Sequence, residues 1–315
     1  MATLESQASA IPIKIKKSKN ASFIKKTPAE RVFDVFLFFA IVWIILVTLY
    51  PFWYIFMASI SAPSYLIRHS GLILLPVGQP TLGAYELVLL RNPNIPMGYY
   101  NTMIYVTVGL AMNMFMTIIA AYCLSRTTKL TGFFTFFVTF TMLFSGGMIP
   151  SFLLIRNLGW IDTRWAIWVP PAISVFNLII MRTNFKSLPD SLLESARMDG
   201  ASEITCLLKI MIPLSKPVIA VILLFYAVTR WNSWFPAILF LRSRDLFPLQ
   251  LILREILIMN DLNAFTAGAG SADREPIGLT VQYATIIVST LPILCVYPFL
   301  QKYFVKGVMI GAVKG

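Results

Sequence analysis

The sequence predicts an all-α integral membrane protein with six membrane-spanning helices. Of its 315 residues, 57% are hydrophobic and only 13% are charged, whereas an average soluble domain carries about 25% charged residues. The apolar residues form runs long enough to cross a bilayer, which takes about 20 residues as a helix. Backbone polar groups inside a bilayer must be paired within the segment, so helices are the expected structure.

Six apolar runs define a membrane domain over residues 32–301, between tails at 1–31 and 302–315. The first run is too long and too aromatic for the core of a signal peptide, so we expect it to be retained as a helix. In the third run, Gly146 and Gly147 indicate a close helix approach or a bend. The expected spans lie at about 32–60, 99–124, 131–155, 165–183, 216–240 and 280–301.

The distribution of lysine and arginine predicts the orientation. With the N-terminus inside, the inner segments hold more than twice as many of these residues as the outer segments. Because cytoplasmic loops are enriched in lysine and arginine, both tails are expected to be cytoplasmic. The basic segment from Lys14 to Lys26 is therefore interpreted as a topogenic signal rather than as a nucleic acid-binding segment.

Two expected outer loops, 61–98 and 241–279, are long. The first is rich in proline, and the second holds apolar residues at helical spacing from Leu246 to Met259, which predicts an amphipathic helix. Three scattered cysteines predict no disulfide framework, and the single histidine, His69, predicts no zinc site. We find no obvious internal repeat, which disfavours a secondary carrier built from inverted repeats.

The longest inner loop, residues 184–215, is predicted to be a helix–turn–helix. Pro189 precedes Ser191 and Glu194, whose spacing indicates a capping box at the start of a helix. Gly200 indicates a sharp turn, because glycine accepts backbone angles that other residues resist. Ser202 is expected to cap a second helix that runs toward Pro213.

The spacing in this loop resembles the EAA motif of permease subunits of ATP-binding-cassette (ABC) importers that depend on an extracellular binding protein. Ser195 stands where the motif usually has a second alanine, and Ile212 stands where leucine precedes the proline. The motif residues present here are Glu194, Ala196, Gly200, Ile210 and Pro213.

Two further segments resemble the sugar-transporting members of that family. Trp231-Asn-Ser-Trp-Phe-Pro236 is similar to the fifth helix of sugar permeases, and the tail from Val305 to Gly315 is similar to the tail of the maltose-type second permease. The resemblance starts near residue 30 and is greatest with the aldouronate and complex-oligosaccharide group of Gram-positive bacteria. It implies the fold of a type I ABC importer permease in the bacterial cytoplasmic membrane.

The resemblance also implies roles for the residues of the loop. In the family this loop forms a coupling helix that sits in a cleft on the ATPase subunit. A hairpin that is merely solvated at the membrane surface would explain the amphipathic pattern but not the joint spacing of the motif. The residues implied to act in coupling to the ATPase are Glu194, Ser195, Ala196, Asp199, Gly200, Ala201 and Pro213.

The chain has no GxxxxGK[ST] phosphate-binding loop, so it is expected to be a non-catalytic translocation subunit that binds no cofactor and no metal. ATP and magnesium are expected on partner ATPase subunits. The resemblance implies a second homologous permease, two ATPase subunits and an extracellular, lipid-anchored solute-binding protein as partners. Membrane lipids and an oligosaccharide substrate complete the set, and no nucleic acid partner is expected.

Polar and aromatic residues within the runs are candidates for a substrate path, because sugar rings stack on aromatic faces and hydroxyl groups need polar partners. Each candidate has an alternative role in interhelical hydrogen bonding or in an interfacial aromatic belt. Arg230 stands out, since a charge within a span is costly and often functional, and it is suited to an acidic sugar. The candidates are Asn113, Asn177, Arg230, Trp231, Asn232 and Trp234.

The predicted function is therefore that of a permease subunit of an ATP-driven oligosaccharide importer, with uronate-containing sugars as one candidate substrate class. Two alternatives stay open at this point. One is a permease of the same machine type for a non-sugar solute, such as amino acids or peptides. The other is a self-sufficient secondary carrier or channel, which ion-coupled uptake by the purified chain alone would favour.

Overall fold

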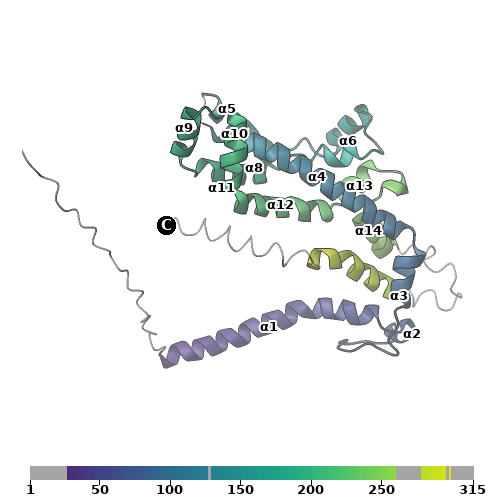
Figure 1. Ribbon diagram of the computed structural model, residues 1–315. Coiled ribbons are helices and arrows are strands. Elements are labelled where there is room, and N and C mark those ends of the chain that lie inside the picture. The colour runs from purple at the N-terminus through teal and green to yellow at the C-terminus, as the bar shows by residue number, and fades with distance from the viewer. Residues whose placement is uncertain (1–26, 127–128, 260–277, 296–297, 299–315) are drawn as a thin grey trace, which may run out of the picture. The chain divides into compact units, whose positions relative to one another are not determined.

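The computed structural model describes residues 27–126, 129–259, 278–295 and 298, and these residues are helical without β-strands (Figure 1). By contacts the chain divides into two compact units, Met1–Pro51 and Phe52–Gly315. Each unit is described by itself. The expected C-terminal tail and the glycine-rich part of the second outer loop lie outside the described residues.

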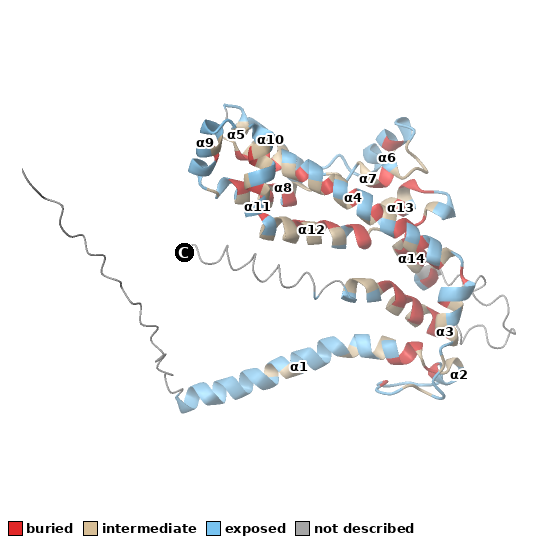
Figure 2. Cartoon of the chain, viewed as in Figure 1, coloured by how far each residue is buried: buried red, intermediate tan, exposed pale blue. Residues whose placement is uncertain are grey.

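The first unit contributes most of helix α1, which runs from Pro28 to Ser59 and continues into the second unit. A capping box starts this helix: the backbone N–H of Thr27 donates to Oε2 of Glu30 (2.8 Å), and the N–H of Glu30 donates to Oγ1 of Thr27 (3.3 Å). The helix thus begins before the expected boundary at residue 32. It is apolar on all sides and almost wholly exposed, as Figure 2 shows, which suits a lipid environment.

The second unit is organised around helix α4, which extends over 32 residues from Asn94 to Ser125. Helices α8 (Val175–Lys186), α12 (Lys216–Trp231) and α14 (Leu249–Met259) pack against it. The buried side of α4 is rich in small and polar residues, which let helix backbones approach closely. At Gly98, for example, an added Cβ would lie 2.6 Å from Cδ1 of Ile252.

The remaining elements are mostly short, apart from the helix Gly278–Cys295. Several are single turns between the long helices, and two have π-helical geometry. They are α2 (Pro63–Leu66), α3 (Gly83–Glu86), η1 (Leu87–Arg91), α5 (Thr131–Leu143), α6 (Met148–Asn157), α7 (Trp165–Trp168), α9 (Asp190–Met198), α10 (Glu203–Cys206), η2 (Leu207–Met211), α11 (Ile212–Leu214), α13 (Phe235–Phe240), η3 (Arg244–Leu246) and an unlabelled helix Gly278–Cys295.

The described residues contain three helices that are long and apolar enough to cross a membrane: α1, α4 and Gly278–Cys295. Two bent pairs raise this number to five if each pair is one span. Helices α5 and α6 meet at 110°, and the segment Glu203–Leu214 meets α12 at 84°. The six-span count and the cytoplasmic side of the termini therefore stay predictions.

Three of the expected spans are interrupted rather than continuous. The third divides into α5 and α6 at Gly147, whose φ of +87° ends the helical path. The fourth divides into α7 and α8 at residues 169–174, which include Pro170 and Pro171. The fifth ends at Trp231, and α13 restarts with Pro236 in its first turn.

The predicted amphipathic helix of the second outer loop is confirmed as α14. It begins at Leu249 rather than at Leu246 because Pro248 lies directly before its first turn. Leu249, Ile252 and Ile256 are buried in a hydrophobic cluster that also holds Ile95 of α4. This face packs on α4, as the spacing of the apolar residues requires.

Polar contacts secure the segment before α14 to the Asn94 end of α4. The side-chain amide of Asn101 donates to the carbonyl of Asp245 (2.6 Å), and the hydroxyl of Tyr105 donates to that of Leu246 (2.9 Å). Oγ1 of Thr102 accepts from the backbone N–H of Leu249 (2.9 Å). These bonds pair backbone groups that have no partner within a helix. They explain why α4 carries polar residues on its buried face.

Asp162 holds the segment that follows α13. Its Oδ1 accepts from the backbone N–H groups of Arg242 (2.9 Å) and Ser243 (2.8 Å), and its Oδ2 accepts from the Ser243 hydroxyl (2.5 Å). The hydrogen bonds from Ser243 lower the pKa of Asp162. Its own φ is +59°, a conformation that aspartate tolerates better than most residues.

A buried charge holds the break between α7 and α8. Arg230, near the end of α12, is only 7% exposed. Its guanidinium group donates to Oδ1 of Asn113 (3.0 Å) and to the backbone carbonyls of Ile167 (2.6 Å), Trp168 (3.2 Å) and Pro171 (3.2 Å). The last carbonyls of α7 and the turn after it thus find donors that their own helix does not supply.

Asn113 of α4 completes this arrangement, which we call the Arg230 brace. Its side-chain amide donates to the carbonyls of Pro171 (2.6 Å) and Ala172 (2.8 Å) while its oxygen accepts from Arg230. Gly109 makes room for the guanidinium group, since a Cβ added at Gly109 would lie 3.1 Å from Cζ of Arg230. The brace ties α4, α12 and the broken segment together.

A second pair of residues, one helical turn away, extends the brace. The hydroxyl of Tyr226 on α12 accepts from the backbone N–H of Ser174 (2.9 Å) and lies 2.7 Å from Oγ1 of Thr117 on α4. Tyr226 precedes Arg230 by four residues, and Thr117 follows Asn113 by four, so each pair shares one helix face. Both ends of the break are therefore held by the same two helices.

The brace predicts that Arg230→Met destabilises the protein. Methionine has nearly the same length but leaves the carbonyls of residues 167, 168 and 171 without these donors, and each buried unsatisfied group costs about 1–3 kcal/mol. We expect a clear fall in the thermal unfolding midpoint of the detergent-solubilised protein. The matched control is Arg91→Met, whose ion pair with Glu86 is exposed and contributes little. Equal midpoints for the two variants would contradict the structural role of Arg230.

Candidate functional site

The segment 184–215, which the sequence places on the inner side, folds as the predicted helix–turn–helix. Helix α9 leads to a turn at residues 199–202, followed by α10, the π-helical turn η2 and α11. These elements lie together at the Ser125 end of α4 (Figure 1). Residues 184–215 are called the loop.

The turn is a Schellman motif, which explains the glycine at position 200. The backbone N–H of Gly200 donates to the carbonyl of Arg197 (3.0 Å), and that of Ala201 donates to the carbonyl of Ala196 (2.9 Å). Gly200 occupies the left-handed position with φ +82°. No atom lies within 4 Å of a Cβ placed there, so the requirement for glycine is one of backbone conformation.

The two helix starts differ from each other. Ser202 caps α10 as predicted, because its Oγ accepts from the backbone N–H of Thr205 (3.3 Å). The capping box predicted at Ser191 and Glu194 is wrong. Helix α9 already begins at Asp190, with Pro189 at the capping position, and Pro189 has no side-chain acceptor.

Pro213 lies inside the short helix α11 rather than at its end. A proline lacks the N–H that would bond to the carbonyl four residues earlier, and its ring crowds that carbonyl. The π-helical turn Leu207–Met211 directly before α11 widens the backbone at this point. The chain then turns at Ser215 and enters α12 at an angle of 84°.

Apolar residues anchor the loop in the second hydrophobic cluster. Leu193 of α9, Cys206 of α10 and Met211 of η2 are each at most 2% exposed, and they belong to one cluster with Tyr122 and Phe185. The rings of Tyr122 and Phe185 meet edge to face, with centroids 6.4 Å apart. Each part of the loop thus has at least one side chain fixed against the helices below it.

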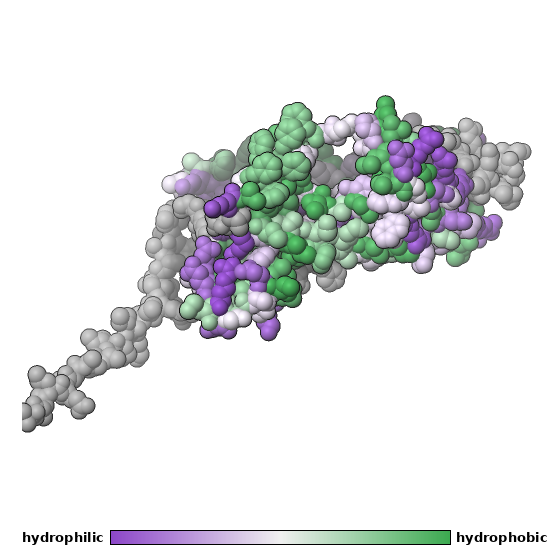
Figure 3. Space-filling model, turned by 90° about the horizontal axis from the view of Figure 1, so that it is seen from above, coloured by the Kyte–Doolittle hydropathy of each residue, from purple (hydrophilic) through white to green (hydrophobic). Residues whose placement is uncertain are grey.

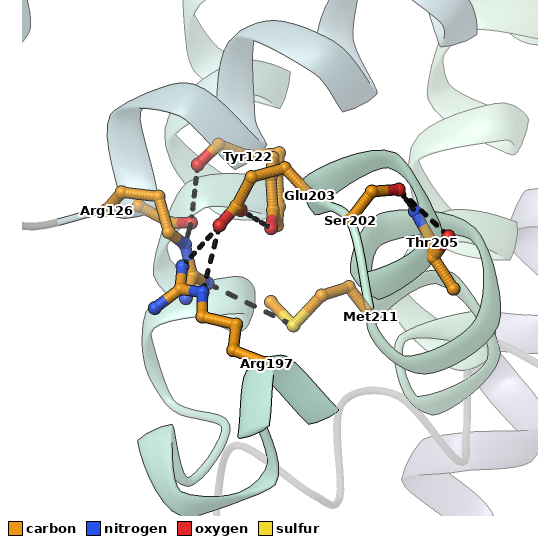
Figure 4. A network of polar contacts seen from close by, with 8 residues as sticks. Tyr122, Arg126, Arg197, Ser202, Glu203, Thr205 and Met211 are labelled. Atoms are coloured by element: carbon orange, nitrogen blue, oxygen red, sulfur yellow. Dashed lines mark hydrogen bonds and ion pairs between the residues drawn. The ribbon is translucent and has the colours of Figure 1, made fainter. Parts of the chain in front are cut away.

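A polar network around Glu203 also joins the loop to α4, as Figure 4 shows. The hydroxyl of Tyr122 donates to Oε2 of Glu203 (2.5 Å), and Arg197 donates to Oε1 from Nε (2.9 Å) and Nη2 (2.8 Å). The hydrogen bond to Glu203 raises the pKa of Arg197. Glu203 therefore contacts both α4 and the last turn of α9.

Arg126 lies on the other side of the Tyr122 ring. Its guanidinium carbon is 4.9 Å from the ring centroid, within the range of a cation–π contact, and its Nη2 is 4.0 Å from Sδ of Met211. The same side chain bonds to Oγ of Ser125 through Nε (3.2 Å). The ring of Tyr122 thus contacts Phe185 and Arg126, while its hydroxyl bonds to Glu203.

The outer surface of the loop carries exposed apolar side chains beside the predicted polar ones. Met198 at the turn is 88% exposed, and Ile204 and Leu208 of the second helical stretch are 71% and 57% exposed. Glu194 and Asp199 are exposed too, and no hydrogen bond or ion pair of their carboxylates is present among the described residues. An apolar tip with free carboxylates next to it is a surface suited to a protein partner.

Of the predicted coupling residues, the structure places Asp199, Gly200 and Ala201 in the turn and Ala196 in the last turn of α9. Ser195 lies in the last two turns of α9 and is exposed, as are Glu194 and Asp199. Sequence reasoning did not find Tyr122 and Glu203. They are 81 residues apart, so the sequence near either residue does not indicate that they form a pair. Glu203 alone is not distinctive, because an acidic residue directly after a helix cap is common.

The predicted path residues fall into two groups. Asn113, Asn177 and Arg230 are buried, and the first and third belong to the Arg230 brace. The other three lie at the end of α12. Trp231 is buried, its ring centroid is 6.5 Å from that of Tyr99, and its indole N–H has no partner among the described residues.

Asn232 and Trp234 differ from their neighbour Trp231 in being exposed. Asn232 donates to the carbonyl of Val228 (3.0 Å) one turn earlier. The Trp234 ring lies 4.7 Å from the guanidinium carbon of Arg254 on α14. Within the described residues, no group of three or more His, Cys, Asp or Glu side chains is placed to hold a metal ion.

Helices long and apolar enough to cross a bilayer, with exposed hydrophobic side chains, define the class of the protein as an integral membrane protein. Figure 3 shows hydrophobic surface between two groups of hydrophilic residues on the face viewed. Residues 113–310 match the family described as binding-protein-dependent transport system inner membrane component. The chain belongs to this family.

Relatives with known names agree with this assignment. The chain is 42% identical to protein LplC of Bacillus subtilis (strain 168) over 290 residues, which cover 92% of this chain and 97% of that protein. It is 40% identical over 294 residues to the polygalacturonan/rhamnogalacturonan transport system permease protein YtcP of the same strain, covering 91% of this chain and 99% of the relative.

A solved structure shows the fold. The chain superimposes with a TM-score of 0.82 and 36% identity on a chain from the crystal structure of a bacterial ABC transporter involved in the import of the acidic polysaccharide alginate. The match covers 89% of this chain and 99% of that one. These findings confirm the resemblance seen in the sequence and the type I ABC permease fold.

The two serines of the loop give a paired prediction. Ser202→Ala removes the cap of α10 and should cost about 1 kcal/mol of local stability, whereas Ser191→Ala removes no cap and should cost much less. Hydrogen exchange of peptides that cover residues 200–208 should therefore speed up in the first variant only. Faster exchange in Ser191→Ala, at the start of α9, would show that the predicted capping box forms after all.

Gly200 gives a second prediction. Gly200→Ala forces a side chain into the left-handed conformation and should raise the free energy of the turn by about 1 kcal/mol or somewhat more. Gly200→Asn should cost less, because asparagine tolerates these angles. The measurement is hydrogen exchange at the amide of Ala201, which the turn protects. The same exchange rate in both variants would mean that the left-handed backbone conformation is not the reason for glycine at position 200.

Proposed function

We propose that this chain is a permease subunit of an ATP-driven oligosaccharide importer, and that its loop couples the motion of a partner ATPase to transport. The observation that carries this proposal is the loop itself. The turn at Gly200 holds Met198 at the tip, beside the exposed carboxylates of Glu194 and Asp199. Behind this surface, Leu193, Cys206 and Met211 are buried and anchor the loop in the hydrophobic cluster of the second unit.

In this proposal the chain does no chemistry. ATP and magnesium bind to two partner ATPase subunits, each of which receives one coupling loop, and a second homologous permease completes a heterodimer. An extracellular, lipid-anchored binding protein delivers the substrate. Membership of a binding-protein-dependent transport family supports a binding protein, ATPase partners and a paired permease.

The mechanism that we propose is alternating access. ATP brings the ATPase subunits together, each loop moves with its ATPase, and the two permeases rock to face outward. Hydrolysis allows the return to the inward-facing state. A nucleotide shifts such an equilibrium only if it binds one state more tightly than the other, so the contact surface of the loop must differ in energy between the two states.

Acidic oligosaccharides are the substrate class that we propose. One relative is named for polygalacturonan and rhamnogalacturonan, and the structural relative belongs to an importer of the acidic polysaccharide alginate. Trp234 and Asn232 are exposed at the end of α12 and offer an aromatic face and an amide to a sugar. Trp231, Asn113, Asn177 and Arg230 are buried, and in this proposal they shape the path from behind.

The loop is tested by two substitutions in the complete transporter, reconstituted in vesicles with its binding protein. Glu194→Lys reverses a charge on the proposed contact surface, and Gly200→Pro is incompatible with the turn and removes the N–H that bonds to Arg197. We expect ATP-dependent uptake of an acidic oligosaccharide to fall at least tenfold, with membrane insertion unchanged.

Asp190→Asn is the matched control. This carboxylate lies in the first turn of the same α9, away from the turn at Gly200, and its neutralisation should leave uptake unchanged. Undiminished uptake in both Glu194→Lys and Gly200→Pro would refute the coupling role. Uptake of neutral but not of acidic oligosaccharides by the unaltered transporter would refute the proposed substrate class alone.

A further inference from the structure

We infer that Glu203 is a positioning residue for energy coupling, which fixes the orientation of the loop relative to helix α4 through Tyr122 and Arg197. The inference rests on the proposed coupling function of the loop. Glu203 is not on the contact surface proposed for the ATPase. It acts through the two side chains that it joins, Tyr122 on α4 and Arg197 on α9.

Glu203 is suited to this role because its two carboxylate oxygens have different partners. Oε2 accepts from Tyr122 of α4, and Oε1 accepts from Nε and Nη2 of Arg197 in α9. Hydrogen bonds to a charged carboxylate are shorter and stronger than neutral ones. A single side chain at the first position of α10 thus fixes a long helix on one side and the coupling helix on the other (Figure 4).

Helix α9 depends on this contact because little else holds it. It is fully described, and Leu193 is its one buried residue. A helix fixed at one buried point and by the turn that follows it can still pivot. The bonds from Arg197, one position before Met198, hold the end of α9 that carries the exposed tip.

On the α4 side of the network, Tyr122 is held in place by its neighbours. It is 7% exposed, it packs edge to face on Phe185, and Arg126 covers its ring. Tyr122 also belongs to a helix of 32 residues that contacts α8 and α12. A displacement of α9 that is passed to Tyr122 therefore reaches the body of the second unit.

Stability alone does not account for the network. The side chains of Arg197 and Glu203 are 45% and 56% exposed, and ion pairs this exposed contribute little to folding. A substitution at Glu203 is therefore expected to leave the fold intact and to change how faithfully motion is transmitted. This separates a positioning role from a purely structural one.

The first test measures transport and ATP hydrolysis together in the reconstituted transporter. Glu203→Gln keeps the shape of the side chain but replaces one acceptor oxygen by a donor, and Tyr122→Phe removes only the hydroxyl. We expect ATP hydrolysis within about twofold of the unaltered complex and at least about fivefold less sugar transported per ATP, the lower end of usual coupling energies. Asp190→Asn, a carboxylate of the same loop outside the network, should leave both rates unchanged.

The second test is a charge exchange. Arg197→Glu and Glu203→Arg each place like charges together, so each should lower transport per ATP. The double variant restores opposite charges at the same two positions, and an arginine at position 203 still has donors for the Tyr122 oxygen. We expect the double variant to recover most of the loss. Failure of this rescue would overturn the role of Arg197.

The outcomes separate the inference from the proposed function. If Glu203→Gln and Tyr122→Phe transport as much sugar per ATP as the control while Glu194→Lys does not, the inference is overturned and the coupling role of the loop stands. If Glu194→Lys and Gly200→Pro also transport normally, the coupling role itself fails. Equal losses of ATP hydrolysis and transport would overturn the inference too, because they would assign the network to assembly.

Discussion

The second unit depends on one interaction more than on any other: the buried guanidinium of Arg230 bonded to carbonyls of the segment between α7 and α8. A non-helical segment inside an apolar environment leaves carbonyls without donors, and an unsatisfied one is costly. Arg230 and the amide of Asn113 supply those donors from two different helices. The break is thereby stable, and α4 and α12 are fixed to each other through it.

This constraint explains features that otherwise look unrelated. Gly109 is needed because the guanidinium lies against its Cα, and Tyr226 and Thr117 are needed because the other end of the break exposes the N–H of Ser174. A charge within a span often indicates a substrate site, and Arg230 was predicted on that ground. Here four of its hydrogen bonds end on protein atoms, so its first effect is to hold the segment between α7 and α8.

The sequence predicted the elements whose cause is local. Helices α4 and α14 follow from apolar spacing, and the turn at Gly200 and the cap at Ser202 follow from backbone angles and side-chain reach. The capping box at Ser191 failed because the capping position is Pro189, two residues earlier, which places Ser191 inside α9. The bend at Gly147 is one of the two outcomes that the glycine pair indicated, whereas the break at Pro170 was not predicted. Apolar composition continues through each break, and only tertiary donors decide whether a chain tolerates it.

The network around Glu203 and the Arg230 brace share helix α4, and this gives the fold a physical route for coupling. Tyr122 contacts the loop near the Ser125 end of α4, and Asn113 of the same helix bonds to Arg230. With a rise of 1.5 Å per residue, these two positions are about 14 Å apart along the helix. A continuous hydrogen-bonded helix resists bending over that length, so it passes on a displacement at Tyr122 as a shift at Asn113. Because Asn113 holds both Arg230 and the carbonyl of Pro171, that shift acts on α12 and on the broken segment at once. In the proposed coupling mechanism, motion at the exposed loop would reach the interior by this route without any change in which residues are paired.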